Sequence, residues 1–208
     1  MYIIGDIHGC ASTLEDLLSE IPSGEDIYSV GDLVDRGPDS SKVVSICMEA
    51  GIRTVLGNHE HMLLDYIDGS GFYGKGQFFA NGGKATMDSY GGSIPSKHED
   101  FLRSLPLFIE GDDFILSHAG VHFAYTLEEA CQIGDHWDFN ILWNRSHLAD
   151  LGKLQVVGHT YNRSFVKIME KGRMIGVNID TGCCYDRYCK LTAISLPGLN
   201  TIEVKRYI

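Results

Sequence analysis

The chain opens with Tyr2-Ile3-Ile4-Gly5-Asp6-Ile7-His8-Gly9, an apolar run that ends at a glycine and leads directly into two candidate metal ligands. Short apolar runs bounded by glycine are typical of buried strands. Similar runs at residues 27–30, 54–56, 114–116 and 155–157 each lead into a polar motif. The five motifs are Gly5-Asp6-Ile7-His8-Gly9, Gly31-Asp32-Leu33-Val34-Asp35-Arg36-Gly37, Gly57-Asn58-His59-Glu60, His118-Ala119-Gly120 and Gly158-His159-Thr160.

The polar residues of these motifs form a recognisable set of metal donors. Side chains that follow several strands of one sheet converge on one rim, where open α/β folds place their sites. Carboxylate, amide oxygen and imidazole donors without thiolate suit Mn, Fe or Zn in hydrolysis rather than a structural zinc site. The sequence therefore predicts a two-metal phosphoesterase.

Length and charge limit the classes of partner. The 208 residues are within the range of one domain with a sizeable core, so we expect residues 1–208 to form a single catalytic domain. The formal net charge of −11 argues against nucleic-acid polymers and acidic membranes, because no broad positive surface would attract them. It does not argue against a phosphorylated substrate, since bound cations and arginines would make the pocket locally positive.

Cellular location is indicated by what the sequence lacks. No stretch approaches the roughly 20 apolar residues that span a bilayer, and no signal-peptide pattern precedes the first strand. Six cysteines occur without a CxxC pair. These features favour a reduced, cytoplasmic protein.

The first third of the chain alternates strands with helices. The capping-box pattern Ser12-Thr13-Leu14-Glu15 predicts the start of one helix, Ser40 or Ser41 the start of a second that ends at Gly51, and a third begins near His59. Right-handed crossovers make such a run a parallel sheet. Residues 69–83 are glycine-rich and aromatic, and amphipathic segments follow around 84–90 and 98–105. After Pro106 the pattern changes to strands and loops, ending with strands at 173–178, 190–196 and 201–207.

The five motifs, in this order, resemble the metal-dependent phosphoprotein phosphatases of the calcineurin-like metallophosphoesterase family. The most similar members are the small bacterial and bacteriophage-lambda-type serine/threonine protein phosphatases. The resemblance extends from Gly5 to about Leu196 and includes Asn81-Gly82-Gly83, Leu142-Trp143-Asn144-Arg145 and Ile179-Asp180-Thr181-Gly182. It implies an α/β architecture in four layers, with two facing mixed β-sheets flanked by helices, where composition alone indicates only a single α/β domain.

The resemblance also implies a dinuclear metal centre. Asp6 and His8 would hold the first ion, Asp32 would bridge to the second, and Asn58, His118 and His159 would complete the second site. Mn is the expected metal at both positions, with Fe or Zn as alternatives, because the same donors accept all three. The implied chemistry is in-line attack on a phosphomonoester by a metal-bound hydroxide, without a phosphoenzyme.

Catalytic and substrate-binding roles follow the same likeness. His59 and Asp35 match the pair that protonates the leaving oxygen, since a histidine supported by a carboxylate stays partly protonated near neutral pH. Arg36 and Arg145 are candidate phosphate clamps because a guanidinium matches phosphate oxygens with two parallel hydrogen bonds. Asn58 is expected to contact the phosphate while it binds metal.

Two other classes of protein fit the sequence less well. A cysteine-dependent phosphatase would carry a cysteine followed five residues later by an arginine in a phosphate-binding loop, and none of the six cysteines has that context. A catalytically inactive phosphopeptide-binding module would usually have lost ligands, and every candidate ligand is present.

The substrate is less sharply indicated. The resemblance favours a phosphorylated protein or peptide for two reasons. Asp35 stands where many dedicated dinucleotide hydrolases have a small residue, and the chain lacks the C-terminal extension that those hydrolases often carry. The alternative is a symmetrical bis(5'-nucleosyl)-tetraphosphatase, which cleaves diadenosine tetraphosphate to two ADP. The aromatic, glycine-rich residues 69–79 could stack an adenine or form a rim that admits a peptide.

Overall fold

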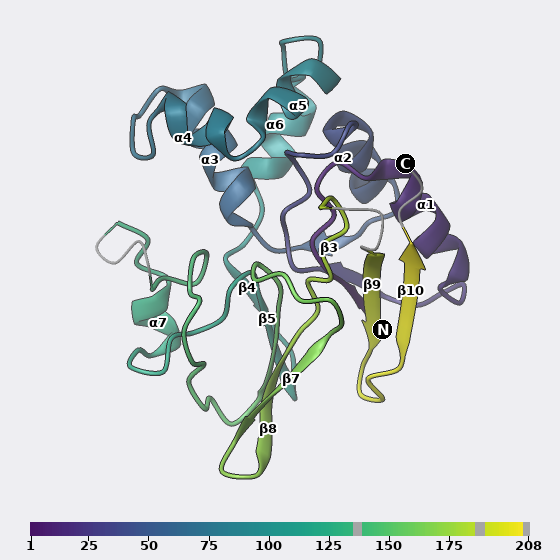
Figure 1. Ribbon diagram of the computed structural model, residues 1–208, viewed down its shortest axis with the longest axis vertical. Helices are drawn as coiled ribbons and strands as arrows, with labels where there is room; N and C mark the ends of the chain where they lie inside the picture. The colour runs from purple at the N-terminus through teal and green to yellow at the C-terminus, as the bar shows by residue number, and fades with distance from the viewer. Residues whose placement is uncertain (135–138, 186–189, 206–208) are drawn as a thin grey trace.

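The computed structural model, which describes residues 1–134, 139–185 and 190–205, contains two five-stranded mixed sheets that face each other (Figure 1). Sheet A has the order β10-β9-β1-β2-β3, in which β1, β2 and β3 are parallel, β9 is antiparallel to β1, and β10 is antiparallel to β9. Its strands are β1 (Tyr2–Ile4), β2 (Ile27–Ser29), β3 (Arg53–Thr54), β9 (Lys190–Ser195) and β10 (Thr201–Lys205).

Sheet B has the order β4-β5-β6-β8-β7, in which β5, β6 and β8 are parallel and the two edge strands antiparallel. Its strands are β4 (Phe108–Glu110), β5 (Phe114–Ser117), β6 (Leu154–Val157), β7 (Val166–Glu170) and β8 (Arg173–Asn178). The helices are α1 (Ala11–Glu20), α2 (Ser40–Glu49), α3 (Asn58–Asp68), α4 (Lys75–Ala80), α5 (Gly83–Ser89), α6 (Ser96–Arg103) and α7 (Leu127–Ala130).

Two hydrophobic cores hold these layers together. Ile3 lies in the core between the sheets, together with Val30 and Leu116, whereas Ile4 lies in the core between sheet A and the helices. Both isoleucines are fully buried. Strands covered on both faces read as continuous apolar runs, which explains why Tyr2-Ile3-Ile4 does not alternate with polar residues.

The outer face of sheet B is covered largely by irregular chain between β5 and β6, a segment that also contains α7. The buried Gln155 side chain of β6 fixes this cover, because its Oε1 accepts from Val121 N at 2.9 Å and its Nε2 donates to Ala149 O at 2.7 Å. On the other side of the molecule α1 packs against β9 and β10, and α2 contacts α1, α5 and α6. The expected pair of facing mixed sheets flanked by helices is confirmed.

Several element boundaries differ from those predicted. Helix α1 begins at Ala11 after Cys10, with no side-chain cap, so the predicted capping box at Ser12 is wrong. Helix α2 does begin at Ser40, but its cap is Asp39, whose carboxylate accepts from Lys42 N. The glycine-rich segment, in which the sequence predicts no helix or strand, contains the short helix α4. The end of the last strand, predicted at 207, lies outside the described residues.

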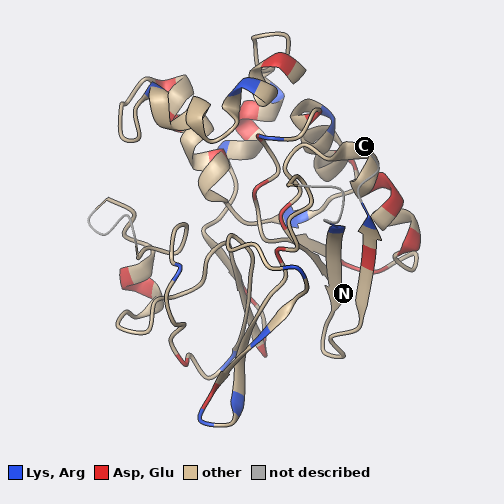
Figure 2. Cartoon of the chain, viewed as in Figure 1, with Lys and Arg blue, Asp and Glu red and all other residues tan. Residues whose placement is uncertain are grey.

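Charged side chains are interspersed over the helices and both sheets (Figure 2). Many pair locally, as Arg103 does with Asp68 and Glu99 on the helical side. Lys153 pairs in the same way with Glu110. Among the described residues, no helix is long and apolar enough to cross a membrane.

Candidate active site

The six expected metal ligands come together where the parallel strands of both sheets end. Asp6, Asp32 and Asn58 follow β1, β2 and β3 of sheet A. In sheet B, His118 follows β5 and His159 follows β6. Facing sheets bring these strand ends to one rim, as the sequence predicts. All six side chains are buried, with exposed fractions of 7% or less: Asp6, His8, Asp32, Asn58, His118 and His159.

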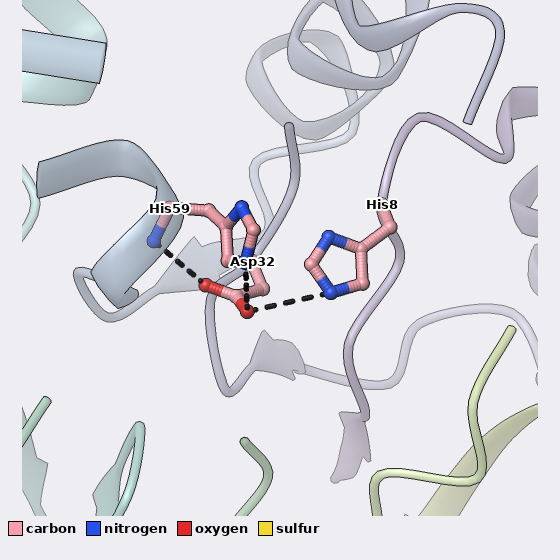
Figure 3. A group of neighbouring side chains, drawn as sticks. All are labelled: His8, Asp32 and His59. Carbon is pink, nitrogen blue, oxygen red and sulfur yellow. Dashed lines mark hydrogen bonds and ion pairs between the residues drawn. The ribbon is translucent and has the colours of Figure 1, made fainter. Parts of the chain in front are cut away.

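Asp32 lies at the centre of the donor cluster. Its Oδ2 is 3.4 Å from His8 Nε2 and 3.9 Å from His59 Nε2, and its Oδ1 is 3.4 Å from His118 Nε2. Figure 3 shows the Asp32 carboxylate between the His8 and His59 rings. Two triads have donor atoms within 4.8 Å of one another, His8 with Asp32 and His59, and Asp6 with Asp32 and His118. Asp32 belongs to both, as a bridging carboxylate would. The triads do not follow the expected division of the ligands, since one includes His59 and the other joins Asp6 of the first site to His118 of the second.

Backbone carbonyls orient two of the imidazole rings. His8 Nδ1 donates to Val34 O at 2.9 Å, and His118 Nδ1 donates to Val30 O at 2.8 Å. A proton held on Nδ1 leaves the Nε2 lone pair directed at Asp32 and its surroundings. This tautomer is the one that a cation-binding histidine needs.

Two further observations indicate that this donor set suits divalent cations. His118 Nε2 lies 2.7 Å from Asn58 Oδ1, so two acceptors face each other at a distance suited to two ligands of one ion. His159 Nε2 is buried and has no hydrogen-bond partner. Buried polar atoms are rarely left unpaired, so this nitrogen indicates a missing ligand.

The electrostatics of the cluster favour neutral imidazoles around one anion. Burial lowers the pKa of His8, His118 and His159, whereas the negative charge of Asp32 acts to raise it. Burial alone would raise the pKa of Asp32, but the surrounding histidines, His118 foremost, bring it well below its ordinary value. Burial and then Asp180 raise the pKa of Asp6. Bound cations would replace the protons that Asp6 and Asp180, whose pKa values are raised, otherwise tend to retain.

Glu60 fixes the loop that carries Asp32. Its Oε2 accepts from Asp32 N at 2.8 Å and Gly57 N at 3.0 Å, and its Oε1 accepts from Leu33 N at 2.7 Å and Val34 N at 3.1 Å. The side chain is fully buried. The carboxylate of Glu60 therefore caps the start of α3 through Gly57 N and also joins the motifs that follow β2 and β3.

The expected acid pair is in contact. His59 Nδ1 lies 2.7 Å from Asp35 Oδ2, and both side chains are 1% exposed or less. Thr86 holds Asp35 in place, since its hydroxyl donates to Asp35 Oδ1 at 2.6 Å and accepts from Asp35 N at 2.8 Å. The other imidazole nitrogen of His59 faces Asp32, so this ring spans the pair and the donor cluster.

The two candidate phosphate clamps adjoin different parts of the cluster, Arg36 beside His8 and Arg145 beside Thr160, the residue after His159. Arg36 NH1 is 2.6 Å from His8 Nε2 and donates to Tyr185 Oη at 3.0 Å. Arg145 NH1 donates to Thr160 Oγ1 at 3.3 Å and lines a cavity of about 410 Å³. The cavity is also lined by Ala119 and Gly158, which adjoin the candidate ligands His118 and His159.

The aromatic segment at residues 69–79 supports the site indirectly, through Trp143. Tyr73 Oη accepts from Trp143 Nε1 at 2.8 Å and lies 2.9 Å from His61 Nδ1. The Trp143 ring in turn stands edge-on to His159, with centroids 5.7 Å apart. The Asp65 carboxylate anchors the segment by accepting from Phe72 N and Tyr73 N. These contacts assign the segment a supporting position that the sequence alone does not reveal.

Asp180 is a buried carboxylate that the predicted ligand set omits. It follows β8, the third parallel strand of sheet B, and is 3% exposed. Burial and the charge of Asp32 raise the pKa of Asp180 to about 6. The signal for it was present in the sequence, because Asp180 follows an apolar strand just as Asp6 does.

Comparison with known proteins identifies the family. The model of the calcineurin-like phosphoesterase family matches residues 1–189. A symmetrical bis(5'-nucleosyl)-tetraphosphatase of Ralstonia nicotianae is 34% identical over 137 residues, which cover 64% of this chain and 46% of the relative. The chain thus spans about half the length of that relative. Serine/threonine-protein phosphatase 1 of Salmonella typhimurium is 46% identical over 68 residues, 31% of this chain and 32% of the relative.

Two matches extend over almost the whole chain. An asymmetrical bis(5'-nucleosyl)-tetraphosphatase of Geobacillus thermodenitrificans is 28% identical and is matched over 97% of this chain and 92% of its own length. A crystal structure described as a candidate diadenosine tetraphosphatase superposes with a TM-score of 0.69 at 26% identity, covering 99% of this chain and 93% of that one. The family model, the donor cluster and the facing sheets agree, and the chain belongs to the calcineurin-like phosphoesterase family.

Proposed function

We propose that residues 1–208 form one catalytic domain that hydrolyses diadenosine tetraphosphate symmetrically, with two divalent cations, Mn at both positions, held by the buried donor cluster. The observation that carries the hydrolytic part is the orphaned, buried Nε2 of His159 beside the shared carboxylate Asp32. Asp6 and His8 would hold one cation, Asn58, His118 and His159 the other, and Asp32 both. When bound, the cations supply Lewis-acid activation of water and of the phosphoryl group.

The chain's own residues supply the remaining functions. Arg36 and Arg145 would bind phosphate oxygens, with Asn58 as a further contact; their contacts with His8 and Thr160, next to the cluster, support this role. His59 would donate a proton to the departing oxygen, with its Nδ1 held by Asp35 at 2.7 Å. Both residues are buried, so the pair keeps its geometry without competition from water.

The choice of substrate corrects the preference drawn from the sequence. The relatives matched over the larger part of this chain are named as tetraphosphatases, whereas the serine/threonine phosphatase match covers 31% of it. Length does not separate the two classes, because one named tetraphosphatase is matched over 92% of its own length. Polyphosphate substrates also suit a site with two arginines at different parts of the donor cluster.

A serine/threonine protein phosphatase is the second candidate. It is favoured by the contact between His59 and Asp35, since a poor alkoxide leaving group needs a proton more than ADP does. ADP leaves as a stable anion, so a dinucleotide hydrolase depends less on such a pair.

The test is a comparison of kcat/KM, with Mn(II) supplied, for diadenosine tetraphosphate and a phosphothreonine peptide. A preference of a hundredfold or more for the nucleotide, with ADP as the sole product, supports the proposal. ATP and AMP as products would overturn symmetrical cleavage. A hundredfold preference for the peptide would establish the second candidate. The Asp32→Asn variant is the matched blank for contaminating phosphatases.

A further inference from the structure

Two tyrosines form an exposed aromatic surface beside the donor cluster. The rings of Tyr161 and Tyr185 lie 5.1 Å apart with an interplanar angle of 33°, and the residues are 36% and 51% exposed. Tyr161 lies two positions after His159, and Tyr185 lies five after Asp180. Both therefore belong to loops that leave strands at the rim of the site.

The local backbone holds the two loops together. Asn162 N donates to Asp180 O at 3.0 Å, which joins the loop after β6 to the loop after β8. Gly182 has a φ of +74°, and a Cβ there would lie 2.4 Å from the Tyr161 ring. Only glycine adopts this conformation readily and also leaves room for the ring. The tyrosine pair is thus built into the fold.

Arg36 connects this surface to the donor cluster. Its guanidinium carbon lies 5.2 Å from the centroid of the Tyr185 ring, and its NH1 donates to the Tyr185 hydroxyl at 3.0 Å. The same nitrogen is 2.6 Å from His8 Nε2. A phosphate bound by Arg36 would therefore lie next to the aromatic surface, so this surface is a candidate platform for a base attached to the same phosphate chain.

We propose that Tyr161 and Tyr185 form the nucleobase-binding subsite, on which the adenine of the nucleotide held at Arg36 stacks. This inference rests on the proposed function and deepens it. Aromatic side chains stack nucleic-acid bases because every base has a π-face, and a phosphoserine or phosphothreonine side chain has no planar ring. The tyrosine pair therefore selects nucleotides over phosphorylated side chains.

The rival location for the base is the segment at residues 69–79. Phe78 in this segment is 1% exposed, whereas Phe72 and Phe79 are 48% and 43% exposed. Phe72 stands edge-on to His61 and Tyr73, and Phe79 stands edge-on to Tyr66, so their contacts lie with the helical side and not with a candidate phosphate clamp. Tyr73 itself contacts Trp143 through its hydroxyl. The segment supports the site, and the tyrosine pair is the aromatic surface that adjoins a candidate phosphate clamp.

Binding of ADP and of pyrophosphate to the Mn(II)-loaded protein, measured by calorimetry, tests the subsite. Tyr161→Leu should weaken ADP binding about tenfold, the contribution of one stacked base, and leave pyrophosphate binding within about twofold. Tyr185→Phe keeps the ring and should retain the preference for ADP over pyrophosphate. Phe72→Leu should change neither affinity.

Three results would overturn the subsite. In the first, the wild-type protein binds ADP no better than pyrophosphate. In the second, Tyr161→Leu weakens binding of both ligands equally. In the third, Phe72→Leu and not Tyr161→Leu selectively weakens ADP binding. Failure of the proposed function is separable, because it is decided by turnover of the wild-type protein. Peptide-specific turnover with Tyr161-dependent ADP binding would refute the function and retain the subsite.

Discussion

Replacing Glu60 by glutamine tests how the metal site is built. Each carboxylate oxygen of Glu60 accepts two backbone N–H groups, from Asp32 and Gly57 at Oε2 and from Leu33 and Val34 at Oε1. Glutamine has nearly the same shape but one oxygen. In either orientation of its amide, two buried N–H groups face an NH₂ group and lose their acceptor.

The expected cost follows from this count. An unsatisfied buried donor costs about 1–3 kcal/mol, so two cost about 2–6 kcal/mol. In a domain of this size each kcal/mol lowers the melting temperature by about 2–4 °C. For a loss of about 4 kcal/mol, Glu60→Gln should therefore melt about 8–16 °C below the wild-type protein. Because the same carboxylate positions the Asp32 loop, Mn(II) affinity should fall as well.

The assay is calorimetric melting in the presence of chelator, followed by Mn(II) titration of the folded variant. Glu99→Gln is the matched control, because Glu99 also accepts two hydrogen bonds, from Arg103 on the exposed face of α6. Surface ion pairs contribute at most about 1 kcal/mol, so the control should melt within about 4 °C of wild type. Equal melting of the two variants would refute the hydrogen-bond argument. Unchanged Mn(II) affinity in Glu60→Gln would refute the positioning role alone.

Three further predictions concern the site and its support. His59→Asn should lower kcat by about 100-fold or more for substrates with alkoxide leaving groups and far less for an aryl phosphate; an equal loss on both would contradict the acid role. Tyr73→Phe keeps the ring but removes the acceptor of Trp143 Nε1, so urea unfolding should show a loss of about 1–3 kcal/mol, and an unchanged stability would count against the contact. Burial lowers the pKa of His159, so below pH 6.5 the unfolded chain binds a proton that the folded chain does not, and this residue's stabilising contribution is present above that pH and lost as pH falls. In chelator, the slope of unfolding free energy against pH between 5 and 6.5 should therefore be smaller in His159→Gln than in wild type, by up to about 1.4 kcal/mol per pH unit, and identical slopes would reject the shift.

The sequence predicts well those features that depend on local patterns. Buried parallel strands require apolar runs, and their ends must meet at one rim, so the positions of Asp6, Asp32 and His118 follow from strand prediction alone. Helix α4 was missed because Gly74 and Gly76 oppose helix formation locally. Its helix is stabilised by packing instead, since Phe78 is buried against Tyr66 with ring centroids 4.9 Å apart.

Contacts between distant segments account for what could not be predicted. Tyr73 and Trp143 are 70 positions apart, and Asp35 and Thr86 are 51 apart. No periodicity or motif specifies such pairs, because they depend on how the completed layers pack. The edge strand β7 is not predicted for a different reason. Its side chains are largely exposed or half-buried, so the sequence shows no clear alternation of apolar and polar residues there.

Backbone conformation shows why the site depends on these distant contacts. Five of the expected site residues adopt positive φ values, between +46° and +71°: His8, Asp32, Asp35, Arg36 and His159. Non-glycine residues pay of order 1–3 kcal/mol for such conformations and keep them only where the surroundings enforce them. Glu60 and Thr86 provide that enforcement, since they bind backbone N–H groups at Asp32 and Asp35. Glycine would relieve the strain at these positions but would remove the donor, so the fold must hold functional side chains in a backbone geometry that they do not prefer.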